Sequence, residues 1–193
     1  KLPVVLSVQE VVRLLEAIPM NEDFATRDRA IIELLYACGL RVSEACTLKR
    51  SLLRLEEGYI IVTGKGNKQR LVPIHKEAVK HLELYLEYER PHQKCQPKHS
   101  DTVFLSNRGA ALSRQSIFLK IKKFATSAGI KKAISPHTMR HSFATHLMER
   151  GADLRIVQQL LGHESITTTE IYTHISAQQL SDKIADFHPL NHL

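Results

Sequence analysis

The chain has 193 residues, of which 43% are apolar, enough to fill the core of one domain. Aromatic residues make up only 6% and tryptophan is absent, so we expect aliphatic side chains from packed helices to form that core. The formal net charge of +7 favours a polyanionic partner and excludes nothing else by itself. No segment approaches the roughly 18 consecutive apolar residues that a membrane span needs.

The cysteines and the first residues indicate a cytoplasmic location. The 3 cysteines are widely spaced and form no C-x-x-C pair, a usage typical of reduced thiols, and Cys38 and Cys46 lie among apolar residues as expected of core positions. The start of the chain lacks the apolar segment of a signal peptide. It begins with Lys1 rather than methionine, so we expect a fragment or a processed product.

Three helices are predicted before residue 50. Ser7 and Glu10 form a capping box, and apolar residues follow it at helical spacing from Val11 to Ile18. A second helix is expected over 24–38, ending at Gly39, because glycine readily adopts the left-handed conformation that ends helices. A short third helix fits 42–48.

A change of pattern then predicts a small antiparallel sheet. The segments 52–55, 59–62 and 71–74 are short β-type runs, and a basic turn rich in Gly and Asn, 64–70, joins the last two. Helices resume over 77–88, and a polar surface loop is expected at 91–101. Further helices are predicted over 113–128, from Ser135-Pro136 to Gly151, and over 153–161, 165–173 and 177–187. The predicted fold class is therefore mainly α with a small antiparallel β-sheet.

His137 and Arg140 are the first candidates for function. Residues three apart share a helix face, so both side chains project near a predicted helix N-terminus, where unpaired amides and the dipole favour phosphate. Arginine adds a planar fork that binds two phosphate oxygens. Taken alone, however, a solvent-facing His and Arg pair is the more common explanation.

Other candidates are equally weak when each is considered alone. Arg41, at the start of a short helix, has Glu44 three residues on to orient it, but a surface helix pair has the same pattern. Lys65 lies on the predicted basic turn, and a long ammonium there could donate a proton or simply be solvated. Lys68 and Arg70 are expected to contact phosphate or to be solvated charges.

The last two candidates follow near the C-terminus. His163 comes directly after a helix stop at Gly162, a position where histidine also serves as a helix C-cap. Tyr172 follows nine residues later, and a single tyrosine on a helix is usually a packing residue.

Together and in this order, these segments closely resemble the tyrosine recombinase (phage integrase) family, most of all the bacterial Xer recombinases. The resemblance covers nearly the whole chain and implies a tyrosine recombinase catalytic-domain fold. The blocks that carry it are 36–44 (YACGLRVSE), 64–70 (GKGNKQR), 135–146 (SPHTMRHSFATH), 160–163 (LLGH) and 171–174 (IYTH).

The resemblance implies a role for each matching residue. Arg41 and Arg140 would hold the scissile phosphate, and Glu44 would support Arg41. Lys65 would protonate the leaving 5′-oxygen, and Tyr172 would be the nucleophile that forms a 3′-phosphotyrosyl intermediate. His137 would assist proton transfer and His163 would hydrogen-bond the phosphate. DNA contacts are expected from Lys68, Arg70, Lys122 and His141, and no metal or other cofactor is implied.

The resemblance also implies an assembly. The partner would be a double-stranded recombination site bound by a homo- or hetero-tetramer that proceeds through a Holliday junction, with an activating partner protein and no membrane. We expect a catalytic domain over 1–175 and a C-terminal helix and tail over 176–193; the family's N-terminal core-binding domain is absent from this sequence. Leu180, Ile184 and Phe187 form one stripe that suits docking on a neighbouring subunit or packing in cis, and both arrangements stay open.

Several other functions are compatible with parts of this pattern. A type IB topoisomerase-like strand transferase shares these residue types, but the compact Xer-like pattern and the expected docking helix argue against it. A DNA-binding module without catalysis is disfavoured because all the expected catalytic residues are present. A zinc site at His137, His141 and His146 lacks an H-E-x-x-H motif or a cysteine pair. Within the family, chromosome segregation in the cell cycle, DNA integration by a mobile element and DNA inversion all remain open.

Overall fold

The computed structural model describes residues 2–162, 182, 185 and 187–192. Over these residues the chain is mainly helical with one three-stranded antiparallel sheet, which confirms the predicted fold class. Within the same part of the chain, no helix combines the length and apolar character that crossing a membrane requires.

Helix α1 (Val8–Glu16) begins where the sequence predicts, and α2 (Ala25–Ala37) begins one residue later than expected. At α1, the Ser7 hydroxyl accepts a hydrogen bond from the Glu10 amide at 3.1 Å, and the Glu10 carboxylate accepts one from the Ser7 amide at 2.8 Å. Phe24 lies outside α2 because its backbone is left-handed, with φ of 64°. The Arg27 guanidinium lies over the aromatic ring of Phe24, 4.4 Å from the ring centre.

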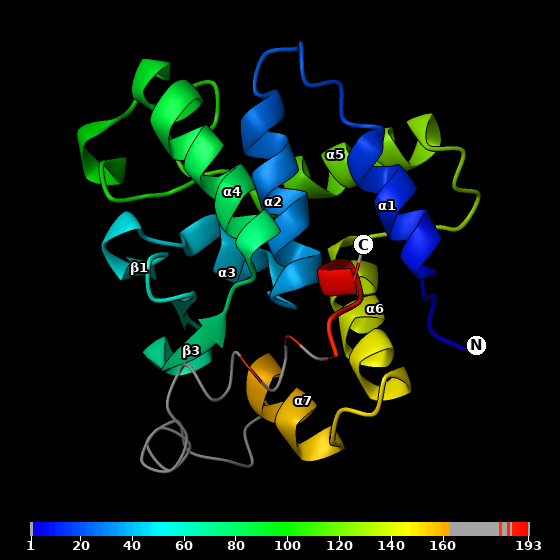
Figure 1. Cartoon of the computed structure of the whole chain (residues 1–193). Coiled ribbons are helices and arrows are strands. Elements are labelled where there is room, and N and C mark those ends of the chain that lie inside the picture. Colours follow the sequence, from blue (N-terminus) through cyan, green and yellow to red (C-terminus); the bar gives the residue numbers. More distant parts are fainter. Residues whose placement is uncertain (1, 163–181, 183–184, 186, 193) are drawn as a thin grey trace.

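Helix α2 occupies the centre of the fold. It packs against α4 (Lys76–Leu84) and α6 (Pro136–Glu149), and it also contacts α1 and α3 (Val42–Thr47). Figure 1 shows α2 between α4 and α1. Ile31, Leu34 and Leu35 are buried, as are Cys38 and Cys46, which were predicted to be core positions. Because α2 is covered on several sides, its C-terminal end is held firmly beside α6.

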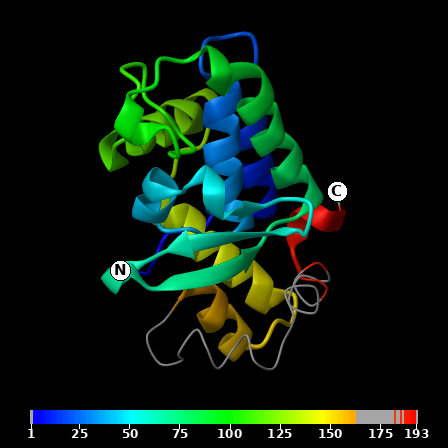
Figure 2. The same ribbon diagram turned by 90° about the vertical axis from the view of Figure 1, so that its left-hand side faces the viewer.

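The sheet has the order β1-β2-β3, with strands Leu53–Arg54, Tyr59–Thr63 and Gln69–Pro73. Strand β1 is shorter than predicted because residues Arg50–Leu52 form a 3₁₀ turn, η1. In the β2–β3 register Ile60 pairs with Val72 and Val62 with Arg70, and all four of these residues are buried. Figure 2 shows the strands between the ends of α2 and α4 and helix α7 (Leu154–Leu161).

The remaining helices follow the predicted order. Helix α4 is succeeded by a π-helical turn, η3 (Tyr85–Glu89), and the predicted loop contains two 3₁₀ turns, η4 (Arg90–His92) and η5 (Pro97–His99). Side-chain caps begin the later helices: Ser113 at α5 (Arg114–Ser127), Ser135 at α6 and Asp153 at α7. The helix predicted over 165–173 and most of that over 177–187 lie outside the described residues.

The described end of the chain packs in cis. His188 is 1% exposed, and its ring centre lies 4.8 Å from that of His75 and 5.4 Å from that of Tyr36. Phe187 and Leu190 pack against the same core, and Pro189–His192 form a short 3₁₀ turn, η6. Figure 1 shows this segment beside α6. The preceding stripe residues Leu180 and Ile184 lie outside the described residues, so trans docking of that helix stays a prediction.

Candidate active site at an arginine cluster

Arg140, a predicted site residue, is firmly held by its surroundings. It lies in the second turn of α6 and is 7% exposed. One Nη donates to the Gly39 carbonyl at 2.7 Å and the other to the Leu161 carbonyl at 2.6 Å. A guanidinium has five N–H donors, so these two bonds fix its plane and leave other donors for an anion.

Gly39 makes this contact possible. Its φ is +61°, and a Cβ built there would lie 2.4 Å from Cδ1 of Phe143 on α6. Only glycine allows this backbone conformation at such close approach. The predicted helix stop is therefore also the point where the end of α2 touches α6 and offers its carbonyl to Arg140.

Arg41 and Glu44 lie at the start of α3, the helix that follows this turn. The Glu44 carboxylate accepts a hydrogen bond from the Arg41 amide at 2.8 Å, and Oε1 lies 3.4 Å from one Arg41 Nη. The Glu44 side chain is 1% exposed, whereas that of Arg41 is 42% exposed. The guanidinium of Arg41 therefore reaches from a buried carboxylate toward solvent, where a phosphate could approach it.

Arg70 corrects the interpretation made from the sequence. It was expected to contact DNA phosphate or to be solvated, but it is 8% exposed and both of its Nη atoms donate to the two oxygens of Glu44, one of them at 2.9 Å. Its Nε donates to the Leu160 carbonyl at 2.9 Å. The missed signal lies in the spacing of Arg70 and Val72, because residues two apart on a strand face the same side and both of these are buried in β3.

The cluster of Arg41, Arg70 and Arg140 around Glu44 is electrostatically suited to an anion. Burial raises the pKa of Glu44, but hydrogen bonds and charge from Arg70, the amide of Arg41 and the charge of Arg140 together hold it below its ordinary value. Glu44 is therefore ionised at neutral pH. Burial lowers the pKa of Arg140 to about 10, and the charges of Arg41 and Arg70 act in the same direction. Three cations around one carboxylate leave a net positive charge that a phosphate would relieve.

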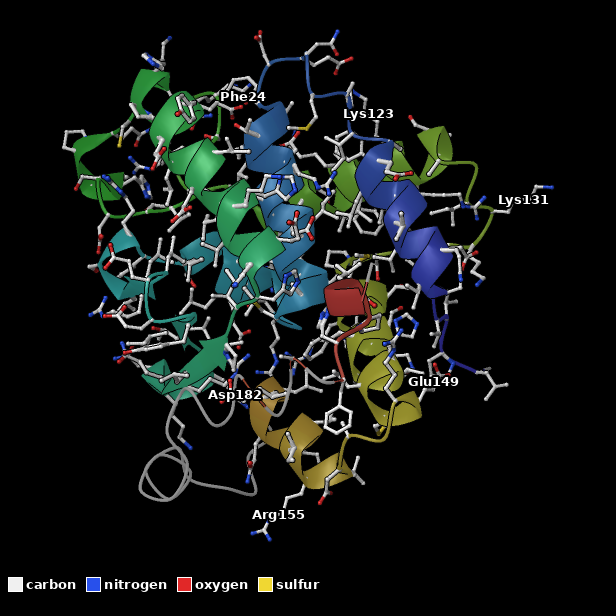
Figure 3. The ribbon with its side chains drawn as sticks, viewed as in Figure 1. Phe24, Lys123, Lys131, Glu149, Arg155 and Asp182 are labelled. Carbon is white, nitrogen blue, oxygen red and sulfur yellow. The ribbon has the colours of Figure 1, made fainter. Side chains whose placement is uncertain are left out.

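The other described candidates lie on neighbouring elements. Lys65 is exposed in η2 (Lys65–Asn67), the 3₁₀ turn at the tip of the β2–β3 hairpin, and Lys68 is exposed beside it. His137 is exposed in the first turn of α6, His141 is half-buried one residue after Arg140, and Lys122 is exposed on α5. Figure 3 shows other basic side chains, Lys131 and Arg155, extending away from the body of the molecule.

His163 and Tyr172 lie outside the described residues, so their assignment rests on sequence. Gly162 closes α7 in the left-handed conformation with φ of +70°. The carbonyls of Leu160 and Leu161 accept hydrogen bonds from Arg70 and Arg140 respectively. The end of α7 is therefore bound to the arginine cluster.

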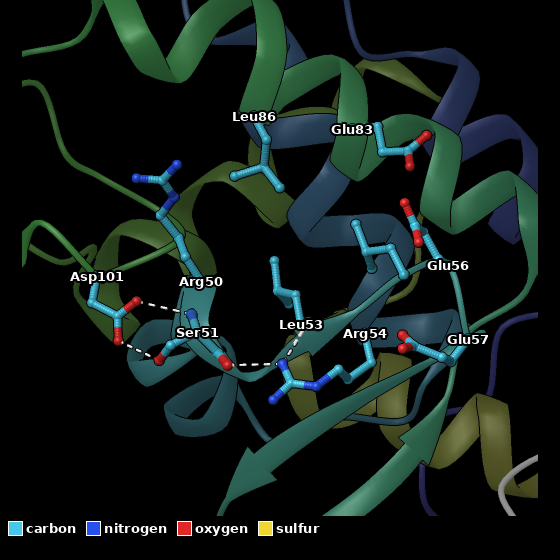
Figure 4. A pocket seen from close by; sticks show the side chains of 10 residues that line it. Arg50, Ser51, Leu53, Arg54, Glu56, Glu57, Glu83, Leu86 and Asp101 are labelled. Atoms are coloured by element: carbon cyan, nitrogen blue, oxygen red, sulfur yellow. Dashed lines mark hydrogen bonds between the residues drawn. The ribbon is translucent and has the colours of Figure 1, made fainter.

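A separate pocket of about 660 Å³ contains none of these residues. Figure 4 shows that the Asp101 carboxylate accepts hydrogen bonds from the amide and the hydroxyl of Ser51, while the Arg54 guanidinium donates to the Ser51 carbonyl at 2.8 Å. In this pocket Asp101 and Arg54 thus bond to Ser51 and to backbone carbonyls. Across the described ranges, no three His, Cys, Asp or Glu side chains gather as metal ligands would, and His146, a residue of the zinc alternative, is buried with Nδ1 2.7 Å from the Tyr36 hydroxyl.

The fold and the arginine cluster define a protein of the phage integrase class, and comparison agrees: residues 4–179 match the phage integrase family, so the chain belongs to it. Among curated proteins it is similar to "Tyrosine recombinase XerD" of Listeria innocua, at 47% identity over 97% of this chain and 63% of the relative. The protein of that name from Staphylococcus aureus is also 47% identical, over 98% of this chain and 64% of the relative. The chain thus spans a little under two thirds of the length of these relatives.

Solved structures show the same likeness. The crystal structure of XerA recombinase has a TM-score of 0.76 at 38% identity, covering 98% of this chain and 67% of that one. XerH site-specific recombinase bound to its difH substrate in a pre-cleavage complex also has a TM-score of 0.76, at 32% identity over 92% of this chain and 52% of that one. The integrase of mycobacterium phage Brujita has a TM-score of 0.72 at 34% identity, covering 98% of this chain and 59% of that one.

Proposed function

We propose that this chain is the catalytic part of a site-specific DNA recombinase that cleaves and rejoins DNA strands through Tyr172. One observation carries the proposal: Arg140, buried and fixed by two carbonyls, lies with Arg41 in a cluster whose charge is positive. A phosphodiester is anionic and resists attack by a nucleophile, so a catalyst must neutralise the charge that develops on its oxygens. The cluster supplies that neutralisation from preorganised groups.

The reaction is a transesterification. The Tyr172 oxygen attacks the scissile phosphorus and forms a 3′-phosphotyrosyl bond while the bond to the 5′-oxygen breaks. The phenol, with an ordinary pKa near 10, must lose a proton, and His137 is the candidate to assist. The leaving 5′-oxygen must gain a proton, and Lys65 is the candidate donor. Attack by a 5′-hydroxyl on the phosphotyrosine reverses these steps, so rejoining needs no external energy source.

The remaining residues would bind the substrate. Arg41 and Arg140 would contact the non-bridging phosphate oxygens, with Glu44 holding Arg41 and His163 adding a further hydrogen bond. Lys68, Lys122 and His141 would contact the DNA around the cleavage point. Because such contacts go mainly to phosphate, they would position the chain without specifying sequence.

The partner would be a double-stranded recombination site. XerH is described as bound to its difH substrate before and after cleavage, which supports DNA as the substrate here. We propose that identical or related subunits form a tetramer on DNA and exchange strands through a Holliday junction. The whole protein would carry an N-terminal DNA-binding domain and would act in the cytoplasm with an activating partner protein. The name "Tyrosine recombinase XerD" of the curated relatives favours an Xer recombinase over a mobile-element integrase.

Suicide DNA tests the proposed chemistry. A nicked duplex with a candidate site is incubated with the chain in EDTA and resolved on a denaturing gel, with Tyr172→Phe in parallel. We expect a covalent protein–DNA band with the unmodified chain alone. A band that survives Tyr172→Phe would place the nucleophile elsewhere and overturn the assignment. If a duplex of random sequence gives as much product as the candidate site, the reaction is that of a topoisomerase-like strand transferase.

A further inference from the structure

We infer that Arg70 is a positioning residue for DNA cleavage: it joins the β2–β3 hairpin, the start of α3 and the end of α7, and so sets the geometry of the phosphate-binding arginines. The inference rests on the proposed function. It concerns the arginine of the cluster whose Nε and both Nη atoms already donate to protein acceptors, the Leu160 carbonyl and the two oxygens of Glu44.

The first link is to Glu44. A guanidinium that meets both carboxylate oxygens fixes the plane of the carboxylate as well as its position. The same carboxylate accepts the amide of Arg41 at 2.8 Å and lies 3.4 Å from its guanidinium. Arg70 therefore orients the group that orients Arg41, without itself reaching a substrate.

The second link is to the end of α7. Arg70 Nε donates to the Leu160 carbonyl, and Arg140 donates to the next carbonyl, that of Leu161. Carbonyls at a helix C-terminus carry partial negative charge and lack partners within the helix, so two guanidinium groups hold this turn. Since Arg140 is one of the two, any shift of the turn moves a proposed phosphate ligand.

The third observation is the closeness of Gly162 to Arg70. A Cβ at Gly162 would lie 3.1 Å from Cδ and 3.2 Å from Cζ of Arg70, and φ there is +70°. The side chain of Arg70 thus fits against the bare backbone of the turn. A methyl group at this position would displace it, which gives a second way to perturb the same contact.

Two variants and one matched control test the inference in the whole chain. Arg70→Lys keeps a charge beside Glu44, but one ammonium lacks the fork that meets two carboxylate oxygens and the Leu160 carbonyl together. Gly162→Ala displaces Arg70 from the side of the turn. Gly58→Ala is the control, because its φ is +79° while no atom lies within 4 Å of the added Cβ, so it has comparable backbone strain and no contact with Arg70.

The measurements separate positioning from folding and from binding. Circular dichroism and urea unfolding select variants that remain folded, fluorescence anisotropy gives the DNA dissociation constant, and single-turnover formation of the covalent band gives the cleavage rate. We expect Arg70→Lys to cleave about 100-fold more slowly, as displacement of catalytic groups by an ångström does, with a DNA affinity within about threefold of the unmodified chain. Gly162→Ala, which shifts Arg70 by a few tenths of an ångström, should slow cleavage by a smaller factor with the same DNA affinity. Gly58→Ala should cleave at the unmodified rate.

A substrate with a bridging 5′-sulfur identifies the route of the effect. A thiolate leaves without an acid because a thiol is far more acidic than an alcohol. The sulfur substrate should restore cleavage by Lys65→Ala but not by Arg70→Lys, if Arg70 acts through the phosphate-binding arginines. Rescue of Arg70→Lys, or an unchanged rate in both Arg70→Lys and Gly162→Ala, overturns the inference. Absence of covalent product from the unmodified chain instead refutes the proposed function on which it rests.

Discussion

Replacement of Arg140 with alanine should separate the catalytic contribution of this residue from its contribution to stability. The substitution leaves the Gly39 and Leu161 carbonyls without their buried donor. Each loss costs about 1–3 kcal/mol, or about 2–6 kcal/mol together. Against this, burial and the neighbouring arginines lower the pKa of Arg140 to about 10, which corresponds to about 3 kcal/mol of unfavourable burial that alanine removes.

The expected net change in the free energy of unfolding is therefore small, between about 1 kcal/mol of stabilisation and about 3 kcal/mol of destabilisation, while loss of a preorganised donor to the developing charge should slow cleavage by at least about 100-fold. Urea unfolding measures the first quantity and single-turnover covalent-band formation the second, with Arg155→Ala, an exposed arginine on α7, as the control. DNA affinity should stay largely intact. If Arg140→Ala loses stability, DNA binding and cleavage in equal measure, Arg140 is a structural arginine and the reasoning is refuted.

Three other outcomes are expected. Burial lowers the pKa of His188 to about 3 and that of His75 to about 4, below the unfolded value of 6.5. Their contribution to stability is therefore present above pH 6.5 and is lost toward pH 4. The free energy of unfolding in urea should depend less on pH in His188→Leu, and an unchanged pH dependence would contradict this. Gly39→Ala should destabilise the chain by about 1–3 kcal/mol in urea through the clash with Phe143, whereas Gly66→Ala, with φ of +70° and open space, should destabilise it less. DNA affinity by anisotropy should fall steeply with salt because each neutralised phosphate releases counterions, and a flat salt dependence would exclude extensive phosphate contact.

The local elements could be read from the sequence because their causes are local. The capping box at Ser7, the caps at Ser135 and Asp153 and the glycine stops at Gly39 and Gly162 lie next to the apolar periodicities that they bound. Phe24 was placed wrongly in α2 because its left-handed backbone is not encoded in apolar spacing. The hairpin and its basic turn were likewise recognisable from alternation and turn residues.

The amino-acid sequence by itself determined the helical class of the fold, the small sheet, and the order of the residues that identify the family. Only the tertiary structure decided that Arg70 pairs with Glu44 instead of facing DNA, and that His188 packs beside Tyr36 in cis. Glu44 and Arg70 are 26 positions apart, and Arg70 and Leu160 are 90 apart. Contacts at such separations depend on how whole elements pack, because a charged side chain is buried only where packing brings it a partner of opposite charge or a carbonyl.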